Sequence, residues 1–157
     1  MTAELETVND VQTRLKGVRT AMVTTPDERG TLSSRPVTIQ KITADGDIWF
    51  LVDLSSDWVR PAGGGAINVA VIDDDETWVS FAGRAEVVSD PAKVDDLKDT
   101  FSDAFFDEAS EPVALRAVTD RIEWWTAAGT MTQLFEIAKA KVTESKPDVG
   151  DSGTIEV

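Results

Sequence analysis

Residues 20–52 read TAMVTTPDERGTLSSRPVTIQKITADGDIWFLV, and this stretch decides the fold. Three runs rich in β-branched residues occupy 20–25, 31–43 and 48–52, a composition typical of strands. The turn formers PDERG and the dipeptide Asp45-Gly46, which type I′ turns favour, separate these runs. Loops this short join antiparallel neighbours, because parallel strands need long crossovers. The stretch therefore predicts a three-stranded meander.

Three more strands are predicted further along the chain, at 66–72, 77–89 and 115–126. An acidic loop joins the first two, and Gly83 is expected to mark a bulge in the second. In the third, Trp124 and Trp125 must face opposite sides, since side chains alternate along a strand. Six antiparallel strands with flanking helices predict a mainly β protein built on a small closed barrel.

Helices are predicted at three places, from apolar residues spaced three and four apart. The first covers 3–16, and the third covers 131–142. The second begins at Asp90-Pro91, an Asx cap before a proline at the first helical position. It is expected to plug one barrel end with a buried stripe of Val94, Leu97, Phe101 and Phe105. We predict a single domain over 1–147, with 148–157 as a tail or a short strand.

Composition narrows the classes of function. A formal net charge of −14 argues against nucleic acid and anionic membranes as partners, because both need a cationic face. No run approaches the roughly 18 apolar residues of a membrane span. Residues 1–15 carry charges where a signal peptide has its apolar stretch. We therefore predict a cytoplasmic location. The chain has no Cys and no His, and so lacks the commonest metal ligands and the commonest general base.

Two segments are candidates for binding an anion. In Ser33-Ser34-Arg35-Pro36 the guanidinium could grip a phosphate through a bidentate fork, or it could belong to an edge strand and face water. In Ser55-Ser56-Asp57-Trp58-Val59-Arg60 the hydroxyls at a helix start could bind an anion with help from Arg60, or could simply cap the helix. Both alternatives stay open at each segment.

Three further features have ordinary structural interpretations. Gly63-Gly64-Gly65 lacks the Lys-Ser or Lys-Thr ending of a phosphate loop and is predicted to be a connector. The loop 73–76 lacks Ca²⁺-site spacing, so we expect a solvated hairpin and no metal site. Trp58, Trp78 and Trp125 lie near loops or strand ends, where a ring could stack on a planar ligand or belong to the core.

The order of the motifs resembles a known family. The motifs are AMVTT at 21–25, SRP at 34–36, GDIWF at 46–50, VSFAGRAE at 79–86 and EWW at 123–125. In this order they resemble the general stress protein 26 group of the pyridoxamine 5′-phosphate oxidase-like FMN-binding split barrels. The resemblance runs from about Leu5 to about Pro147. It implies a six-stranded antiparallel split β-barrel.

The resemblance also implies a homodimer with two FMN sites between the subunits. Arg35 and Ser56 match phosphate-binding positions, while Val37, Thr38 and Val52 match positions beside the isoalloxazine ring. Trp78 and Trp125 match positions contributed by the other subunit. Trp58 stands where the family has a lysine, Asp57 occupies a place that is basic in the oxidases, and Arg60 is the candidate substitute for the missing charge.

The function implied is that of a flavin-dependent oxidoreductase acting on a small organic substrate. In this class the flavin exchanges hydride and the protein supplies orientation and electrostatics. Three alternatives stay open: a non-catalytic flavin-binding stress protein, a relative that binds the deazaflavin F420, and a structural dimer without a cofactor. No catalytic side chain is assigned.

Overall fold

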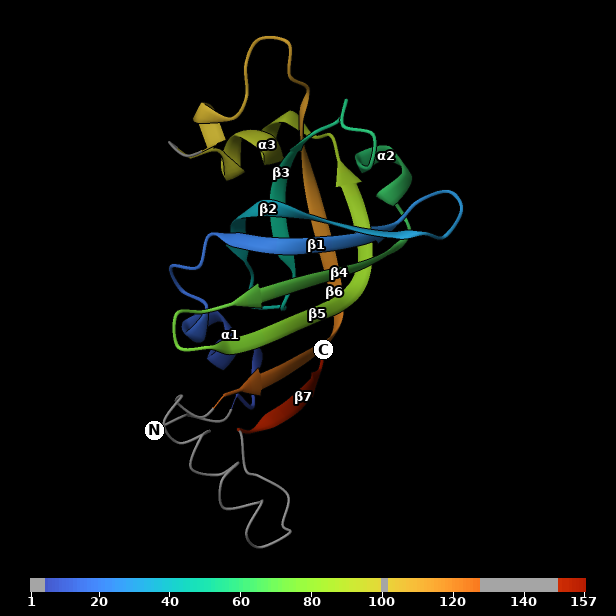
Figure 1. The fold of residues 1–157 in the computed structure, drawn as a ribbon. Coiled ribbons are helices and arrows are strands. Elements are labelled where there is room, and N and C mark those ends of the chain that lie inside the picture. The colour runs from blue at the N-terminus through green and yellow to red at the C-terminus, as the bar shows by residue number, and fades with distance from the viewer. Residues whose placement is uncertain (1–4, 100–101, 128–149) are drawn as a thin grey trace, which may run out of the picture.

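The computed structural model describes residues 5–99, 102–127 and 150–157, and a closed antiparallel barrel forms its centre (Figure 1). The barrel strands are β1 (Thr20–Pro26), β2 (Leu32–Ile42), β3 (Ile48–Asp53), β4 (Ala66–Ile72), β5 (Thr77–Val88) and β6 (Pro112–Thr126). The sheet order is β3-β2-β1-β4-β5-β6, and pairing of β3 with β6 closes it. The predicted meander and the six-stranded barrel are both confirmed.

A seventh strand lies outside the barrel. Strand β7 (Ser152–Glu156) pairs antiparallel with the last part of β6, with Ile155 opposite Ile122. Of the two expectations for the end of the chain, the short strand is therefore the one present. The helix predicted over 131–142 lies outside the described residues.

The hairpin turns follow one pattern that differs from the predicted type I′. At the second turn Gly46 N–H donates to the Thr43 carbonyl, and Thr43 N–H donates to the Asp47 carbonyl, both at 2.9 Å. Gly46 has a φ of +85° but Asp45 does not lie in the left-handed region. The type I′ prediction is therefore wrong: this is a type I turn followed by one left-handed residue. The left-handed position is occupied by Gly30 in the turn between β1 and β2, and by Glu76 in the turn between β4 and β5.

Two short helices add to the main core. Helix α1 (Val8–Arg14) begins at a capping box between Thr7 and Asp10 and buries Val11 completely. Helix α2 (Val59–Ala62) buries Val59 and Ala62 in the same core. The two helices lie at different ends of the barrel (Figure 1). No helix within the described ranges has the length and apolar character needed to cross a membrane.

Helix α3 (Pro91–Leu97) starts where predicted but ends earlier. The Asp90 side chain accepts from Ala92 N–H, as expected of an Asx cap. Lys98 has extended backbone angles, and Asp99 then exchanges hydrogen bonds with Ser102, which starts the 3₁₀ turn η1 (Ser102–Ala104). Local side-chain bonds of this kind compete with helix continuation. Phe105 is 65% exposed, so the predicted stripe is wrong there, and Phe101 lies outside the described residues.

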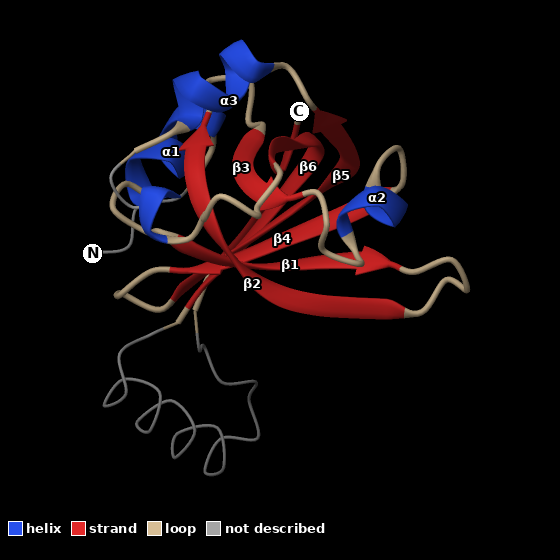
Figure 2. Ribbon diagram, turned by 90° about the horizontal axis from the view of Figure 1, so that it is seen from above, coloured by secondary structure: helices blue, strands red, loops and turns tan. Residues whose placement is uncertain are grey.

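The prediction that α3 plugs a barrel end is also wrong. Along β3, side chains alternate between the barrel interior and its outer surface, and Trp49 and Leu51 face outward. Helix α3 packs against these outward side chains, and Figure 2 shows this helix beside β3. The resulting cluster consists of Trp49, Leu51, Val94, Leu97 and Ala114, and it is separate from the main core.

The later strands confirm one local prediction and correct another. The β5–β6 register shifts between Ala82 and Gly83 as expected, but the extra residue is Asp120 on β6, so the bulge lies opposite Gly83 and not in β5 itself. A Cβ at Gly83 would lie 1.8 Å from the Val118 carbonyl oxygen, so only glycine fits at this crossing. Trp124 is buried whereas Trp125 is 43% exposed, which places the two rings on opposite faces.

Candidate functional site

Strand β2 has one edge without a partner strand over most of its length. It pairs with β1 from Leu32 to Thr38, but with β3 only from Ile39 onward. Ile39 N–H donates to the Arg19 carbonyl on the β1 side. Because this bonding alternates along an antiparallel pair, the backbone groups of Thr38 and Pro36 point away from β1. Proline has no N–H to leave unpaired there, which suits a free edge.

A cavity of about 330 Å³ lies beside this free edge. Its other wall comes from β3, the loop before α2, and the residues around η1. The structure brings six of the predicted contact residues to this cavity: Arg35, Val37, Thr38, Val52, Ser56 and Trp58. Residues separated by more than 20 positions in the sequence therefore line one cavity.

Arg35 is half-buried in the cavity wall and held by three contacts. Its Nη1 donates to Thr25 Oγ1 at 2.7 Å and to the Val23 carbonyl at 3.4 Å. Its guanidinium carbon lies 4.5 Å from the centroid of the Trp58 ring. Burial lowers the pKa of Arg35, yet an arginine stays cationic at neutral pH. Arg35 is thus not the fully solvated edge arginine of the alternative hypothesis.

This cation has no carboxylate partner among the described residues. By contrast, Arg14, Arg19 and Arg116 each pair with an aspartate at 2.6–2.8 Å. Nε and Nη2 of Arg35 also lack a hydrogen-bond partner in the described part of the chain. A partly desolvated guanidinium whose Nε and Nη2 donors have no partner is suited to binding an anionic ligand.

The loop that carries Ser56 is fixed by Asp53. One carboxylate oxygen of Asp53 accepts from Ser55 N–H, Ser55 Oγ and Glu111 N–H at 2.9, 2.7 and 3.3 Å. These hydrogen bonds lower the pKa of Asp53, and the bond from the Ser55 hydroxyl has the largest effect. Trp58 occupies the N-cap of α2 and makes no side-chain cap bond. The plain capping alternative is therefore wrong, and Ser56 lines the cavity instead.

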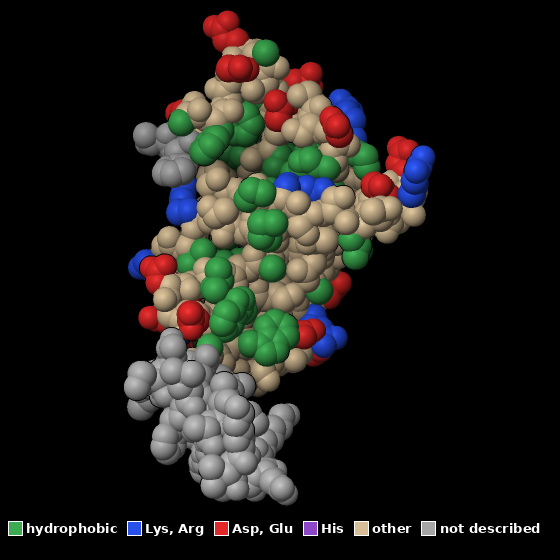
Figure 3. Space-filling model, viewed as in Figure 1, with side chains coloured by type: hydrophobic (Ala, Val, Ile, Leu, Met, Phe, Trp, Pro, Cys, Tyr) green, Lys and Arg blue, Asp and Glu red, His purple; other side chains and the backbone are tan. Residues whose placement is uncertain are grey.

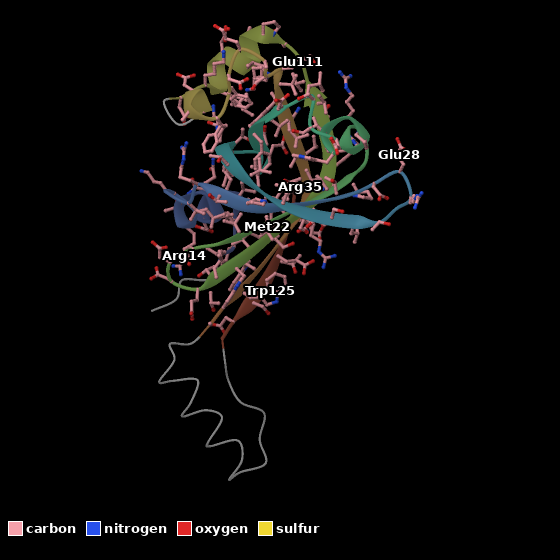
Figure 4. The ribbon with its side chains drawn as sticks, turned by 45° about the horizontal axis from the view of Figure 1, so that its top comes forward. Arg14, Met22, Glu28, Arg35, Glu111 and Trp125 are labelled. Carbon is pink, nitrogen blue, oxygen red and sulfur yellow. The ribbon has the colours of Figure 1, made fainter. Side chains whose placement is uncertain are left out.

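Three predicted contact residues lie elsewhere. Arg60 is exposed on α2 and does not line the cavity. Trp78 and Trp125 stand opposite each other on β5 and β6, with exposed fractions of 42% and 43%. Figure 4 shows Trp125 well away from Arg35, with Met22 between them in that view. The predicted cofactor contacts of all three remain predictions.

Exposed apolar side chains gather on the sheet surface around Met22. Cross-strand register places Met22 next to Ala70, Ile72 next to Trp78, and Trp78 next to Trp125. We call these five residues the apolar face. Figure 3 shows hydrophobic side chains running down this side of the molecule. Contiguous exposed apolar surface of this kind marks an interaction site.

Several cavity residues are not predicted from the sequence. Ser102, Phe105 and Phe106 reach the cavity from the turn after α3, where the sequence pattern continues the helix. Gln40 also lines it. No signal in the sequence marks Gln40, because the β2–β3 register shifts between Ile39 and Lys41 and simple alternation does not hold there.

A larger hollow, of about 690 Å³, lies beside the first residues of β1 and is lined by α1 and by the β4–β5 turn. Arg14 and Asp73 in its wall pair with each other at 2.7 Å. Its wall also carries Lys16, Asp74 and Asp75, and it contains none of the predicted contact residues. In the described ranges no three His, Cys, Asp or Glu side chains are grouped so as to hold a metal ion.

The chain matches a known protein family over most of its length. The sequence profile of the family described as "Pyridoxamine 5'-phosphate oxidase like" matches residues 6–148. The chain belongs to this family. The matched residues include β1–β6 and every residue that lines the cavity. The similarity to the pyridoxamine 5′-phosphate oxidase-like family therefore extends over both the barrel and the candidate site. The resemblance inferred from the sequence is confirmed. No curated protein sequence matches the chain.

Solved structures of similar fold carry related descriptions. One from Jannaschia sp. CCS1, named for general stress protein 26, is 26% identical, covers 93% of this chain and 95% of that chain, and has a TM-score of 0.65. The general stress FMN/FAD binding protein from Xanthomonas citri is 26% identical, covers 74% and 85%, and has a TM-score of 0.63. A pyridoxamine 5′-phosphate oxidase-related, FMN-binding protein from Nostoc punctiforme PCC 73102 is 10% identical, covers 96% of this chain and 95% of that chain, and has a TM-score of 0.61. At this identity the similarity shows the fold alone.

Proposed function

We propose that this chain binds flavin mononucleotide in the cavity beside the free edge of β2. The observation that carries the proposal is the half-buried guanidinium of Arg35, which lines this cavity without a carboxylate partner in the described residues. A phosphate group would supply the missing negative charge and accept from Nε and Nη2. The Ser56 hydroxyl, in the same wall, would donate to a second phosphate oxygen.

The rest of the wall suits a flat ring system. Val37, Val52 and Leu51 offer apolar surface, and the outward backbone groups of Thr38 offer a donor and an acceptor. The Xanthomonas citri relative, described as FMN/FAD binding, supports this choice of ligand. F420, which also carries a phosphate and a related ring, is the ligand to test beside FMN.

We further propose that the working form is a homodimer formed through the apolar face. Met22, the residue of that face on the strand next to β2, lies between Arg35 and Trp125 in Figure 4. A two-fold axis near Met22 would therefore bring Trp78 and Trp125 of the partner subunit toward the cavity. Burial of these exposed rings would remove apolar surface from water at the same time.

The proposed activity is that of an oxidoreductase on a small organic substrate, located in the cytoplasm. Bound FMN supplies the redox chemistry, accepting and releasing hydride. The residues of this chain bind the phosphate, orient the ring and exclude water from one of its faces. A non-catalytic flavin-binding role uses the same pocket, and turnover with NAD(P)H separates the two.

The test is an FMN titration of the purified protein, followed by visible absorption, with Arg35→Ala and Arg60→Ala as a matched pair. We expect Arg35→Ala to lower affinity by roughly tenfold to a hundredfold, the size of a charge-assisted hydrogen bond. We expect a much smaller change for Arg60→Ala, because this side chain lies outside the cavity wall. Equal affinity in wild type and Arg35→Ala overturns the proposal, and parallel titration with F420 identifies the preferred ligand.

A further inference from the structure

Gln40 occupies an irregular position in the barrel wall. In the β2–β3 ladder Ile39 pairs with Phe50 and Lys41 pairs with Trp49, so Gln40 is the extra residue of a β-bulge. A bulge leaves one residue out of the ladder and turns its side chain in a new direction. Gln40 is the bulge residue directly beside the free edge of β2.

The amide of Gln40 is incompletely satisfied. Its Oε1 is buried and accepts no hydrogen bond from the described residues. The other two buried side-chain atoms in this condition, Thr119 Oγ1 and Trp124 Nε1, belong to residues that do not line the cavity. Leaving a buried acceptor unpaired is costly, and such atoms in native proteins call for a ligand, a water or a functional role.

Gln40 stands between two hollows. It lines the candidate flavin cavity and also a second hollow of about 310 Å³ between the α1–β1 connection and β2. It is the one residue common to the two linings in the described part of the chain. Rotation about its side-chain torsions can therefore carry the amide toward the cavity, and interface side chains commonly change rotamer on binding.

Part of the cavity lining is polar on one side and apolar on the other. Thr38 and Gln40 form a polar part of the β2 side, whereas Leu51, Phe105 and Phe106 form an apolar part of the opposite side. The isoalloxazine ring has the same asymmetry, with a dimethylbenzene end and a pyrimidine end. The pyrimidine end carries an imide edge in which an N–H, at N3, lies between two carbonyls. A glutamine amide is the complement of this edge, since it accepts and donates side by side.

We propose that Gln40 hydrogen-bonds the imide edge of the flavin and so fixes which end of the ring faces β2. Oε1 accepts from N3–H while Nε2 donates to a neighbouring carbonyl, which satisfies both amide atoms. The inference rests on the proposed flavin binding. Arg35 and Gln40 both line the cavity, and five residues of a strand rising roughly 3.3 Å per residue set their positions about 16 Å apart.

The test uses FMN and N3-methyl-FMN, which lacks the N3 donor but keeps the phosphate. Both are titrated against wild type, Gln40→Met, Gln40→Leu and Gln12→Met, after circular dichroism has shown native folding. Gln12 is the matched control: its Nε2 donates to the Ile42 carbonyl, and it lines the second hollow but not the cavity. Two variants at Gln40 guard against one of them failing to fold.

We expect wild type and Gln12→Met to bind FMN about threefold to tenfold tighter than N3-methyl-FMN, the size of one net hydrogen bond. We expect that preference to disappear in either Gln40 variant. A wild type that binds both flavins equally, or a Gln40 variant that keeps the preference, overturns this inference and leaves the proposed function standing. Failure of wild type to bind either flavin overturns the proposed function itself.

Discussion

The guanidinium carbon of Arg35 lies over the indole of Trp58, 4.5 Å from the ring centroid. The two residues come from β2 and from the N-cap of α2, and Thr25 on β1 accepts a hydrogen bond from the same guanidinium. A cation–π contact at a partly exposed site is worth about 0.5–1 kcal/mol. The indole therefore orients the cation, at a position where the family resemblance implies a lysine.

Variants at Trp58 distinguish the effect of a ring that orients Arg35 from the effect of an added positive charge. Trp58→Leu removes the stacking ring, so we expect FMN affinity to fall by roughly twofold to fivefold. Trp58→Phe keeps a ring and should retain most of the affinity. Trp58→Lys adds a cation beside the phosphate site, and we expect about tenfold tighter binding from a charge-assisted hydrogen bond. Fluorescence or absorption titrations give all three values, and weaker binding by Trp58→Lys would show that the ring has another role.

The Asp53 carboxylate should make the Ser55–Ser56 loop sensitive to acid. Its folded-state pKa lies below the ordinary value of 3.8, owing first to the Ser55 hydroxyl. The stabilisation is therefore complete above that value and is lost as the pH falls through the lower folded-state pKa. Denaturant unfolding of wild type and Asp53→Ala should give a difference that is constant from about pH 5 to 7 and shrinks below about pH 4.

Asp53→Asn is the matched control for that experiment. The amide oxygen still accepts from the loop but carries no charge to titrate. We expect this variant to differ from Asp53→Ala by an amount that does not change with pH. A pH-independent difference between wild type and Asp53→Ala would contradict the assignment.

Glu76 offers a route to higher stability. Its φ of 59° lies in the left-handed region, where a non-glycine residue is strained by about 1–2 kcal/mol. The equivalent turn position between β1 and β2 is Gly30. We expect Glu76→Gly to raise the free energy of unfolding by about 0.5–1 kcal/mol, after the entropy lost by glycine. Glu76→Ala keeps the strain and should show no such gain in urea unfolding.

Trp125→Glu tests the proposed dimer. The ring is 43% exposed in the single chain, so a charge there should be tolerated by the fold but should disrupt pairing through the apolar face. We expect light scattering to show monomers and FMN titration to show weaker binding. Leu32→Glu is the control, because Leu32 is 70% exposed and outside that face. A wild type that is monomeric at micromolar concentration would contradict the proposal.

The strands and the positions of the turns could be predicted from local chemistry, but the type of turn could not. Turn residues at 26–30 and 45–46 separate runs whose character is unambiguous, and Gly83 marks a crossing that no side chain could occupy. The end of α3 could not be predicted in this way. Apolar spacing continues to Phe105, but the Asp99–Ser102 hydrogen bonds compete with the helix, and periodicity contains no information about such bonds.

The candidate site was predictable in its principal residues but not in their surroundings. Arg35 and Ser56 follow from residue type and from the family resemblance. The contact of Arg35 with Thr25 depends on the β1–β2 register, and its contact with Trp58 depends on the path of a loop. The role inferred for Gln40 depends on a bulge, which alternation of polar and apolar residues does not reveal.

Pro36 has a consequence for the behaviour of this protein in a crowded solution. An open strand edge is a template on which another chain can add a strand, and this leads toward aggregation. On β2 the proline removes one of the donors that such growth would need, and the neighbouring cation of Arg35 resists close stacking of identical chains. The barrel can therefore keep this strand edge unpaired without polymerising through it.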